Sequence, residues 1–245
     1  MAAIIAGMHN RPLYSSLLFL AKVASALLLR LRVHGRVFVP RRGPLIVAPT
    51  HSSFLDPIVA GVLVRRRLTF MAKAFLFEPL FFGRLIRRLG AFPLRDDGRD
   101  VSSVRLALKL LKENRAVLIF PEGTRIRRDG LGRPHPGVAM IAARSGAPVL
   151  PIYIHDSHDA LTELKYGRLP RVYAYAAPPL HVDKPGPGVD RAEYYARQSR
   201  RVMDEIARMR NWHLTTHGLP PEPPGVYVSD PKPLRPAPGG RWSIN

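Results

Sequence analysis

The sequence contains no cysteine among its 245 residues. This absence excludes a disulfide scaffold and a thiolate-ligated metal site, and it fits a reducing compartment. A Gly-x-Ser-x-Gly turn, which presents a nucleophilic serine in many hydrolases, is also lacking. His155, His158 and Asp159 are close in sequence, but their spacing is not that of a metal site and is more typical of a polar loop. We therefore expect no metal and no cofactor.

Acidic residues are scarce, with 18 Asp and Glu against 38 Lys and Arg, which gives a formal net charge of +20. A chain with this positive charge attracts anionic partners, such as lipid head groups, nucleic acid or phosphorylated substrates. The sequence shows no pattern of base-stacking aromatic residues and no nucleic-acid-binding motif. We therefore expect an anionic membrane surface as a partner and expect no nucleic acid. A basic protein that binds membranes or nucleic acid without catalysis stays open as an alternative.

The stretch from Pro12 to Leu29 is mostly apolar and carries one charge, Lys22. As a helix it would be about 27 Å long, close to the hydrocarbon thickness of a bilayer. Its polar residues and the flanking arginines share an arc of roughly 100°, which favours a helix lying in the membrane interface over a spanning helix. A signal peptide and an amphipathic core helix are the competing interpretations.

Beyond this helix, short apolar runs alternate with helical patterns. Leu45 to Ala48, Ala116 to Phe120 and Val149 to Ile154 are typical of buried strands, and Arg36 to Val39 is expected to be a short strand. The alternation predicts an α/β fold, in which a largely buried mixed sheet is flanked by helices, with the N-terminal membrane-interface helix added.

The same patterns divide the chain into three parts. Residues 1–32 would form the membrane-associating helix, and residues 33–212 would form the main domain. A highly charged helix is expected from Arg191 to Met209. From His213 onward prolines recur and periodicity is lost, so residues 213–245 are predicted to be a proline-rich tail.

One histidine has an aspartate at a distinctive spacing. His51 follows the apolar run that ends at Ala48 and precedes Asp56 by five residues. A histidine whose ring is held by a carboxylate removes a proton from an alcohol at neutral pH. If His51 lies at the start of the helix after Asp56, the positive end of the helix dipole would keep the ring neutral. Taken alone, the pair is more typical of an ordinary turn before Pro57 than of a catalytic pair.

A second motif, Phe120-Pro121-Glu122-Gly123-Thr124-Arg125, follows another predicted strand. Gly123 lets the backbone approach a ligand closely, Glu122 is suited to accept a hydrogen bond from a hydroxyl, and Arg125 is suited to bind a phosphate. In isolation the motif is more typical of a surface turn that holds a weak ion pair between Glu122 and Arg125.

Together the two motifs resemble the glycerolipid acyltransferase family, whose best-known members are the 1-acyl-glycerol-3-phosphate acyltransferases. Gly90 to Arg95 and Ala147 to Pro151 resemble two further blocks of that family, in the same order. The resemblance extends from roughly Val33 to Met209. Thr50 stands where family members commonly have asparagine, and Leu94 precedes Arg95 where aspartate is common. These departures leave the reaction class intact and put the acceptor lipid in doubt.

The resemblance implies transfer of a fatty acyl group from acyl-CoA or acyl-carrier protein to the free hydroxyl of 1-acyl-glycerol-3-phosphate. It implies His51 as general base, Asp56 as the group that orients it, and no acyl-enzyme. Substrate-binding residues would come from the second motif and from two basic positions: Glu122, Gly123, Thr124, Arg125, Arg95 and Lys73. The expected product is phosphatidic acid and the expected location is the cytoplasmic face of the membrane. Another lysolipid, glycolipid or aminolipid acceptor stays an alternative.

Overall fold

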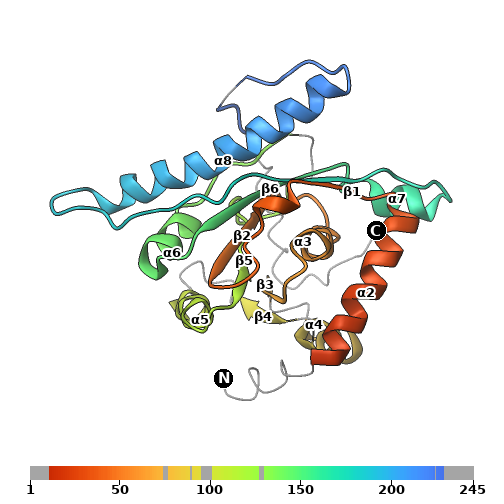
Figure 1. Ribbon diagram of the computed structural model, residues 1–245, viewed down its shortest axis with the longest axis horizontal. Coiled ribbons are helices and arrows are strands. Elements are labelled where there is room, and N and C mark those ends of the chain that lie inside the picture. The colour runs from red at the N-terminus through yellow and green to blue at the C-terminus, as the bar shows by residue number, and fades with distance from the viewer. Residues whose placement is uncertain are drawn as a thin grey trace, which may run out of the picture.

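The apolar run Leu45–Pro49 forms β2, the central strand of a seven-stranded sheet, and all five of its residues are buried. The computed structural model describes residues 11–73, 77–88, 90–94, 101–126, 130–223 and 225–228. Within these residues the strand order is β1-β7-β6-β2-β5-β3-β4 (Figure 1). The other strands are β1 (Arg32–His34), β3 (Leu68–Lys73), β4 (Ala91–Leu94), β5 (Ala116–Leu118), β6 (Val149–His155) and β7 (Tyr173–Ala176).

Most neighbouring strands are parallel, and β6 and β7 form the one antiparallel pair of the described sheet. The predicted mixed sheet is therefore confirmed. β2 runs parallel to both of its neighbours, pairing Ile46 with Val117 of β5 and with Val149 of β6. Consequently the carboxyl ends of β5, β2 and β6 lie side by side at one edge of the sheet, where ligands bind in open α/β sheets.

Side chains of β2 alternate between two hydrophobic cores, because successive residues of a strand point to opposite faces. Ile46 and Ala48 join one core, and Leu45 and Val47 join the other. The first core is covered by α5 (Val101–Lys112), α6 (Gly137–Ser145) and α8 (Arg191–Thr216), and the second by α3 (Asp56–Val64). Helices thus flank the sheet on both sides, as expected (Figure 1).

The predicted N-terminal helix is present as α2 (Arg11–Leu28), which packs against α3 (Figure 1). Leu18 approaches Gly61 of α3, and Ser25 is buried. Large apolar residues on the rest of α2 are exposed: Phe19, Leu20, Val23, Leu27 and Leu28. Among the described residues, no helix combines the length and the hydropathy that crossing a bilayer requires.

Some elements differ from those expected. The predicted strand at Arg36–Val39 is a 3₁₀ helix, η2 (Arg36–Phe38), and the strand β1 precedes it. Gly35, at φ 76°, makes the turn between them. A short helix, α7 (Ala160–Lys165), was not predicted, and α4 covers Leu80–Arg88. The expected helix to Met209 continues as α8 to Thr216, so the predicted start of the tail at His213 falls inside a helix.

Candidate active site

Three loops bring polar side chains together at the carboxyl edge of the sheet. His51 follows β2, Glu122 follows β5, and Ser157 follows β6. These residues are far apart in sequence, but their strands are parallel neighbours, so they meet at one place. The two motifs therefore come together in the folded chain. The third loop adds residues that neither motif contains.

The predicted contact between His51 and Asp56 is present, with 3.1 Å between the ring Nδ1 and Oδ2. Asp56 is fully buried, and it accepts further hydrogen bonds from the backbone N–H groups of Ser52 and Ser53, each at 2.7 Å. The hydroxyl of Ser157 donates to its other oxygen at 2.5 Å. Because an ionised carboxylate only accepts hydrogen bonds, Nδ1 of His51 carries the hydrogen, and Nε2 keeps its lone pair for another partner.

The His51 ring is stacked on Phe120, with 3.6 Å between ring centroids and 13° between the planes. Burial lowers the pKa of His51, and the cation of Arg125 lowers it further, whereas the hydrogen bond and charge of Asp56 raise it. Since α3 begins at Asp56, His51 lies outside that helix. The low pKa thus comes first from burial, rather than from the helix dipole that the sequence suggested. The ring is neutral at neutral pH and can act as a proton acceptor.

Glu122 is buried, with 2% of its surface exposed, and its two oxygens hold two separate segments of backbone. Oε2 accepts from the N–H of His51 at 2.7 Å, and Oε1 accepts from the N–H of Gly132 at 2.9 Å. Burial raises the pKa of Glu122 to about 7, although both N–H groups favour the ionised form. A carboxylate oxygen has two acceptor positions, so each oxygen can still receive a hydrogen bond from a ligand.

The last three residues of the second motif, Gly123 to Arg125, lie beside this site and are partly or fully exposed. Gly123 has φ 67°, a conformation that favours glycine, and both Gly123 and Thr124 are exposed. The guanidinium of Arg125 lies over the ring of Phe54, 3.7 Å from its centroid. Arg95 lies outside the described residues. Lys73 ends β3, but its side chain is outside the described part of the structure.

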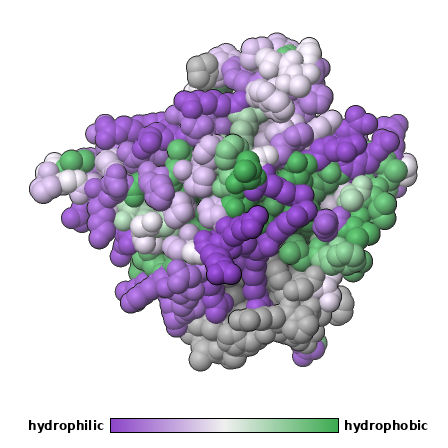
Figure 2. All heavy atoms as spheres, viewed as in Figure 1, coloured by the Kyte–Doolittle hydropathy of each residue, from purple (hydrophilic) through white to green (hydrophobic). Residues whose placement is uncertain are grey.

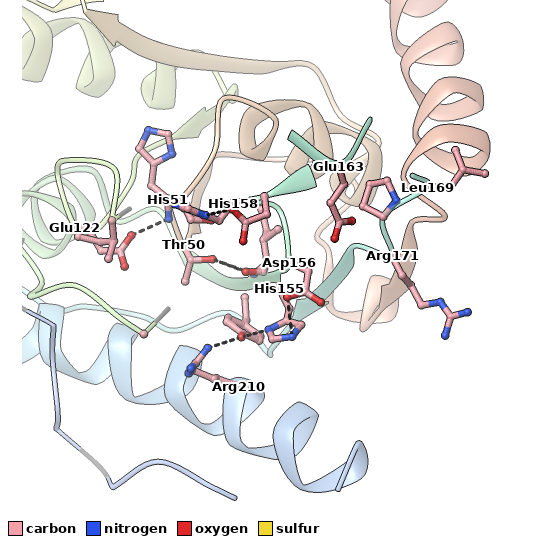
Figure 3. Close-up of a pocket in the computed structure, with 17 residues that line it drawn as sticks. Thr50, His51, Glu122, His155, Asp156, His158, Glu163, Leu169, Arg171 and Arg210 are labelled. Atoms are coloured by element: carbon pink, nitrogen blue, oxygen red, sulfur yellow. Dashed lines mark hydrogen bonds and ion pairs between the residues drawn. The ribbon is translucent and has the colours of Figure 1, made fainter. Parts of the chain in front are cut away.

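A cavity of about 470 Å³ opens beside His51 and Glu122 (Figure 3). Its walls include residues that follow β6 and residues of α7 and α8, among them Asp156, Glu163 and Arg210. Arg125 is not on these walls; its guanidinium lies over Phe54 instead. Of the predicted substrate-binding residues whose side chains the structure describes, Glu122 lines the cavity, and Gly123, Thr124 and Arg125 lie beside it.

Several residues of this cavity were missed by sequence reasoning. His155 is the last residue of β6, and His158 and Asp159 lie in the polar loop that follows it. All three line the cavity. No three His, Asp or Glu side chains in the described residues are grouped as a metal site would require. Arg210 is buried on α8 and donates to the Tyr153 hydroxyl at 2.9 Å. For His158 and Asp159, the one signal in the sequence was their position after a buried strand. Arg210 lies within a charged helix and gave no signal. Strand order is not evident from a sequence.

The sequence is similar to those of known acyltransferases. Residues 30–155 match the family described as Acyltransferase. A 1-acyl-sn-glycerol-3-phosphate acyltransferase of Bacillus subtilis (strain 168) is 31% identical over 61% of this chain and 73% of its own length. A lyso-ornithine lipid O-acyltransferase of Pseudomonas aeruginosa is 29% identical over 76% of this chain and 75% of its own length.

The fold also resembles a solved structure. The crystal structure of the 1-acyl-sn-glycerophosphate (LPA) acyltransferase PlsC from Thermotoga maritima superposes with a TM-score of 0.59 at 23% identity, covering 82% of each chain. This likeness shows that the seven-stranded sheet and its flanking helices are a fold found in a known acyltransferase.

Proposed function

The chain belongs to the Acyltransferase family and is an O-acyltransferase, and we propose that it makes phosphatidic acid. It would move a fatty acyl group from acyl-CoA or acyl-carrier protein to the free hydroxyl of 1-acyl-glycerol-3-phosphate. The contact between His51 and Asp56 at the edge of the cavity is the observation that carries this proposal. A neutral imidazole, oriented by a buried carboxylate and open to a cavity, is suited to general-base catalysis.

The reaction follows from this geometry. Nε2 of His51 removes the proton of the acceptor hydroxyl as its oxygen attacks the thioester carbonyl carbon. The resulting imidazolium is stabilised by Asp56, which already accepts from Nδ1. As the tetrahedral intermediate collapses, the carbon–sulfur bond breaks and the departing sulfur takes the proton from His51. The products are an ester and a thiol, and no acyl-enzyme forms.

The test is His51→Ala in the purified full chain, supplied with a thioester donor and 1-acyl-glycerol-3-phosphate. We expect an unchanged circular dichroism spectrum and the loss of phosphatidic acid formation, measured by mass spectrometry. The control is His181→Ala, since His181 is an exposed histidine that does not line the cavity. A normal rate of acyl transfer in His51→Ala would show that His51 is not the base.

Acceptor binding in this proposal uses two sides of the site. Glu122 lies at the cavity wall and would hold a glycerol hydroxyl, leaving the other hydroxyl to face His51. Arg125 lies beside the site over Phe54 and would bind the phosphate. Arg95 and Lys73 stay predictions for the same phosphate. Gly123 and Thr124 would let the loop approach the glycerol backbone closely.

An acceptor with an amine-bearing head group is a second candidate. Two arginines, Arg171 and Arg210, lie on the walls of the cavity beside His51, and Arg210 is paired with Glu222. The same walls carry the carboxylates of Asp156, Asp159 and Glu163. These would attract an ammonium group. The relative from Pseudomonas aeruginosa, whose name gives a lyso-ornithine lipid as its acceptor, matches most of this chain. Competition between the two acceptors with matched acyl chains, and mass spectrometry of both products, decides between them.

A membrane-associated location is also part of the proposal. The exposed apolar side chains of α2 gather on one side of the molecule, where Figure 2 shows a hydrophobic surface. Arg30 and Arg32 follow the helix and are exposed, so they would meet anionic head groups. We place this contact on the cytoplasmic face of the membrane, with residues 1–32 lying in the interface rather than spanning it.

The membrane contact is tested by flotation of the full chain with anionic vesicles. The double variant Phe19→Asp/Leu27→Asp puts two charges on the exposed face of α2 and should abolish flotation. Val189→Asp, an exposed apolar residue next to the start of α8, is the control and should float as the natural protein does. Undiminished flotation of the double variant would assign membrane binding to another surface.

A further inference from the structure

The chain turns back beside α8 after that helix ends, and one glutamate anchors the returning segment (Figure 1). Glu222 receives two hydrogen bonds from the buried guanidinium of Arg210, at 2.8 Å from Nε and 2.6 Å from Nη2. The side chain of Asn211 donates to the Glu222 carbonyl at 2.9 Å and accepts from its N–H at 3.0 Å. Both the side chain and the backbone of Glu222 are therefore fixed to α8.

The other end of this segment is joined to the loop that returns from the second motif. Val228 donates its N–H to the carbonyl of Leu131 at 2.8 Å, and it forms an isolated parallel bridge with Gly132. The Val228 side chain also covers Gly130 so closely that a Cβ there would lie 3.0 Å from Cγ1 of Val228. Residues 130–132 are thus paired with Val228 by backbone bonding and by packing.

Gly132 connects this pairing to the active site. Its N–H donates to Oε1 of Glu122 at 2.9 Å, and Oε2 of the same carboxylate accepts from the N–H of His51. Gly132 is also closely packed, because a Cβ at this position would lie 2.5 Å from Cδ1 of Ile126. A displacement of residues 130–132 therefore moves the Gly132 N–H, which donates a hydrogen bond to the buried carboxylate of Glu122.

We propose that two described parts of the C-terminal region, residues 222–223 and 225–228, form a clamp that positions Glu122 for the acceptor. It is held at one end by the Arg210–Glu222 ion pair and at the other by the Val228–Leu131 hydrogen bond. Glu222 and Val228 act as positioning residues, since both act through residues 130–132 and not by touching the acceptor. The inference rests on the proposed role of Glu122 in acceptor binding, and it gives part of the proline-rich C-terminal region a function.

The test uses two single substitutions in the full chain. Glu222→Gln removes the charge pairing with Arg210 at nearly constant size. Val228→Pro removes the N–H that donates to Leu131. Hydrogen exchange followed by mass spectrometry measures the protection of the amides at 130–132, and steady-state kinetics measures the KM of donor and acceptor separately. The matched controls are Glu205→Gln, which breaks an ion pair with Arg208 elsewhere on α8, and Val226→Ala, at an exposed position of the same segment.

We expect both variants to speed exchange at 130–132 and to raise the acceptor KM roughly three- to tenfold, leaving the donor KM unchanged. Neither control should do so. Unchanged exchange at 130–132 in both variants would overturn the clamp. Faster exchange with an unchanged acceptor KM would overturn its positioning role. Failure of the proposed function is recognised separately, because the natural chain itself would then transfer no acyl group to the lysolipid, whereas the exchange measurement does not depend on activity.

Discussion

The hydroxyl of Ser157 donates a hydrogen bond to Oδ1 of Asp56 at 2.5 Å, although 101 residues separate them in the chain. Both side chains are completely buried. The bond joins the loop after β6 to the start of α3, and it leaves Oδ2 of Asp56 to the His51 ring and to two backbone N–H groups. A residue outside both sequence motifs thus fixes the carboxylate that holds the proposed base.

Ser157→Ala should lower both stability and activity. Removing a donor to a buried charged acceptor costs about 1–3 kcal/mol of unfolding free energy. The freed carboxylate would hold His51 less firmly, so kcat should fall roughly tenfold. Chemical denaturation and initial rates check this. Ser145→Ala is the control, because Ser145 donates to backbone carbonyls at the end of α6. Its kcat should not change, and an equal loss of kcat in the control would show a non-specific effect.

Asp56→Asn should leave the chain folded and nearly inactive. The amide oxygen can still accept from Nδ1 of His51. The bond to Ser157 reverses, because the amide NH2 would donate to the Ser157 oxygen, whose own hydrogen can turn to Ser52. The negative charge that stabilises the imidazolium is lost, and we expect kcat to fall by roughly 10²–10⁴. Because Asp56 raises the pKa of His51, the acid limb of the pH–rate profile should also move to lower pH. A variant with its full rate and an unmoved acid limb would contradict the orienting role of Asp56.

The stability of the protein should depend on pH through Glu122. Its pKa is raised from 4.5 to about 7 in the folded state, so the folded chain binds a proton more tightly than the unfolded chain. The stabilisation is fully present below pH 4.5 and is lost as the pH rises through about 7. The difference between these two pKa values corresponds to a loss on the order of 3 kcal/mol.

The measurement is chemical denaturation of the natural chain and of Glu122→Gln at intervals from about pH 4.5 to 8. Glutamine does not titrate, so the difference between the two unfolding free energies isolates Glu122 from other titrating groups. We expect the natural chain to lose stability relative to the variant as the pH rises. If the difference in unfolding free energy stays constant across this range, the pKa of Glu122 is not raised in the folded chain.

Arg125→Gln should weaken the binding of a phosphate-bearing acceptor. A charge-assisted bond to phosphate contributes about 1.5–3 kcal/mol, so the acceptor KM measured with the phosphate-bearing lysolipid should rise roughly 10- to 100-fold. With a neutral lysolipid of the same chain length, the acceptor KM should change little. Arg105→Gln, at an exposed arginine of α5, is the control for the loss of one positive charge. An equal rise in KM for both lipids would remove Arg125 from phosphate recognition.

Much of the fold could be predicted because its main strands are continuous apolar runs between turn residues. Leu45–Pro49 is an example, since every residue of it is buried. β1 was missed because it has three residues of mixed exposure at the sheet edge, which give no periodic signal. α8 was expected to end early because prolines follow it. Its last turn persists because His213 and Leu214 are buried, with the Tyr175 hydroxyl 2.6 Å from Nδ1 of His213.

The candidate site was predictable only where its residues are close in sequence or belong to a recognised motif. His51 and Asp56 are five residues apart in the chain, and this spacing predicted their contact. Ser157 and Arg210 lie near the candidate active site only because β6 is beside β2 in the sheet and α8 packs on β6. Such adjacency depends on the packing of the whole sheet, and no local pattern encodes it.

The backbone N–H of His51 is held by the carboxylate of Glu122. Because of this hydrogen bond, a displacement of the Glu122 side chain also displaces the backbone that carries the proposed base, His51. In a lineage that changes its acceptor lipid, a substitution at Glu122 would disturb catalysis together with recognition. Divergence in lipid preference should therefore accumulate on the opposite wall of the cavity, at residues such as Asp156 and Glu163, where a new side chain leaves the position of the imidazole intact.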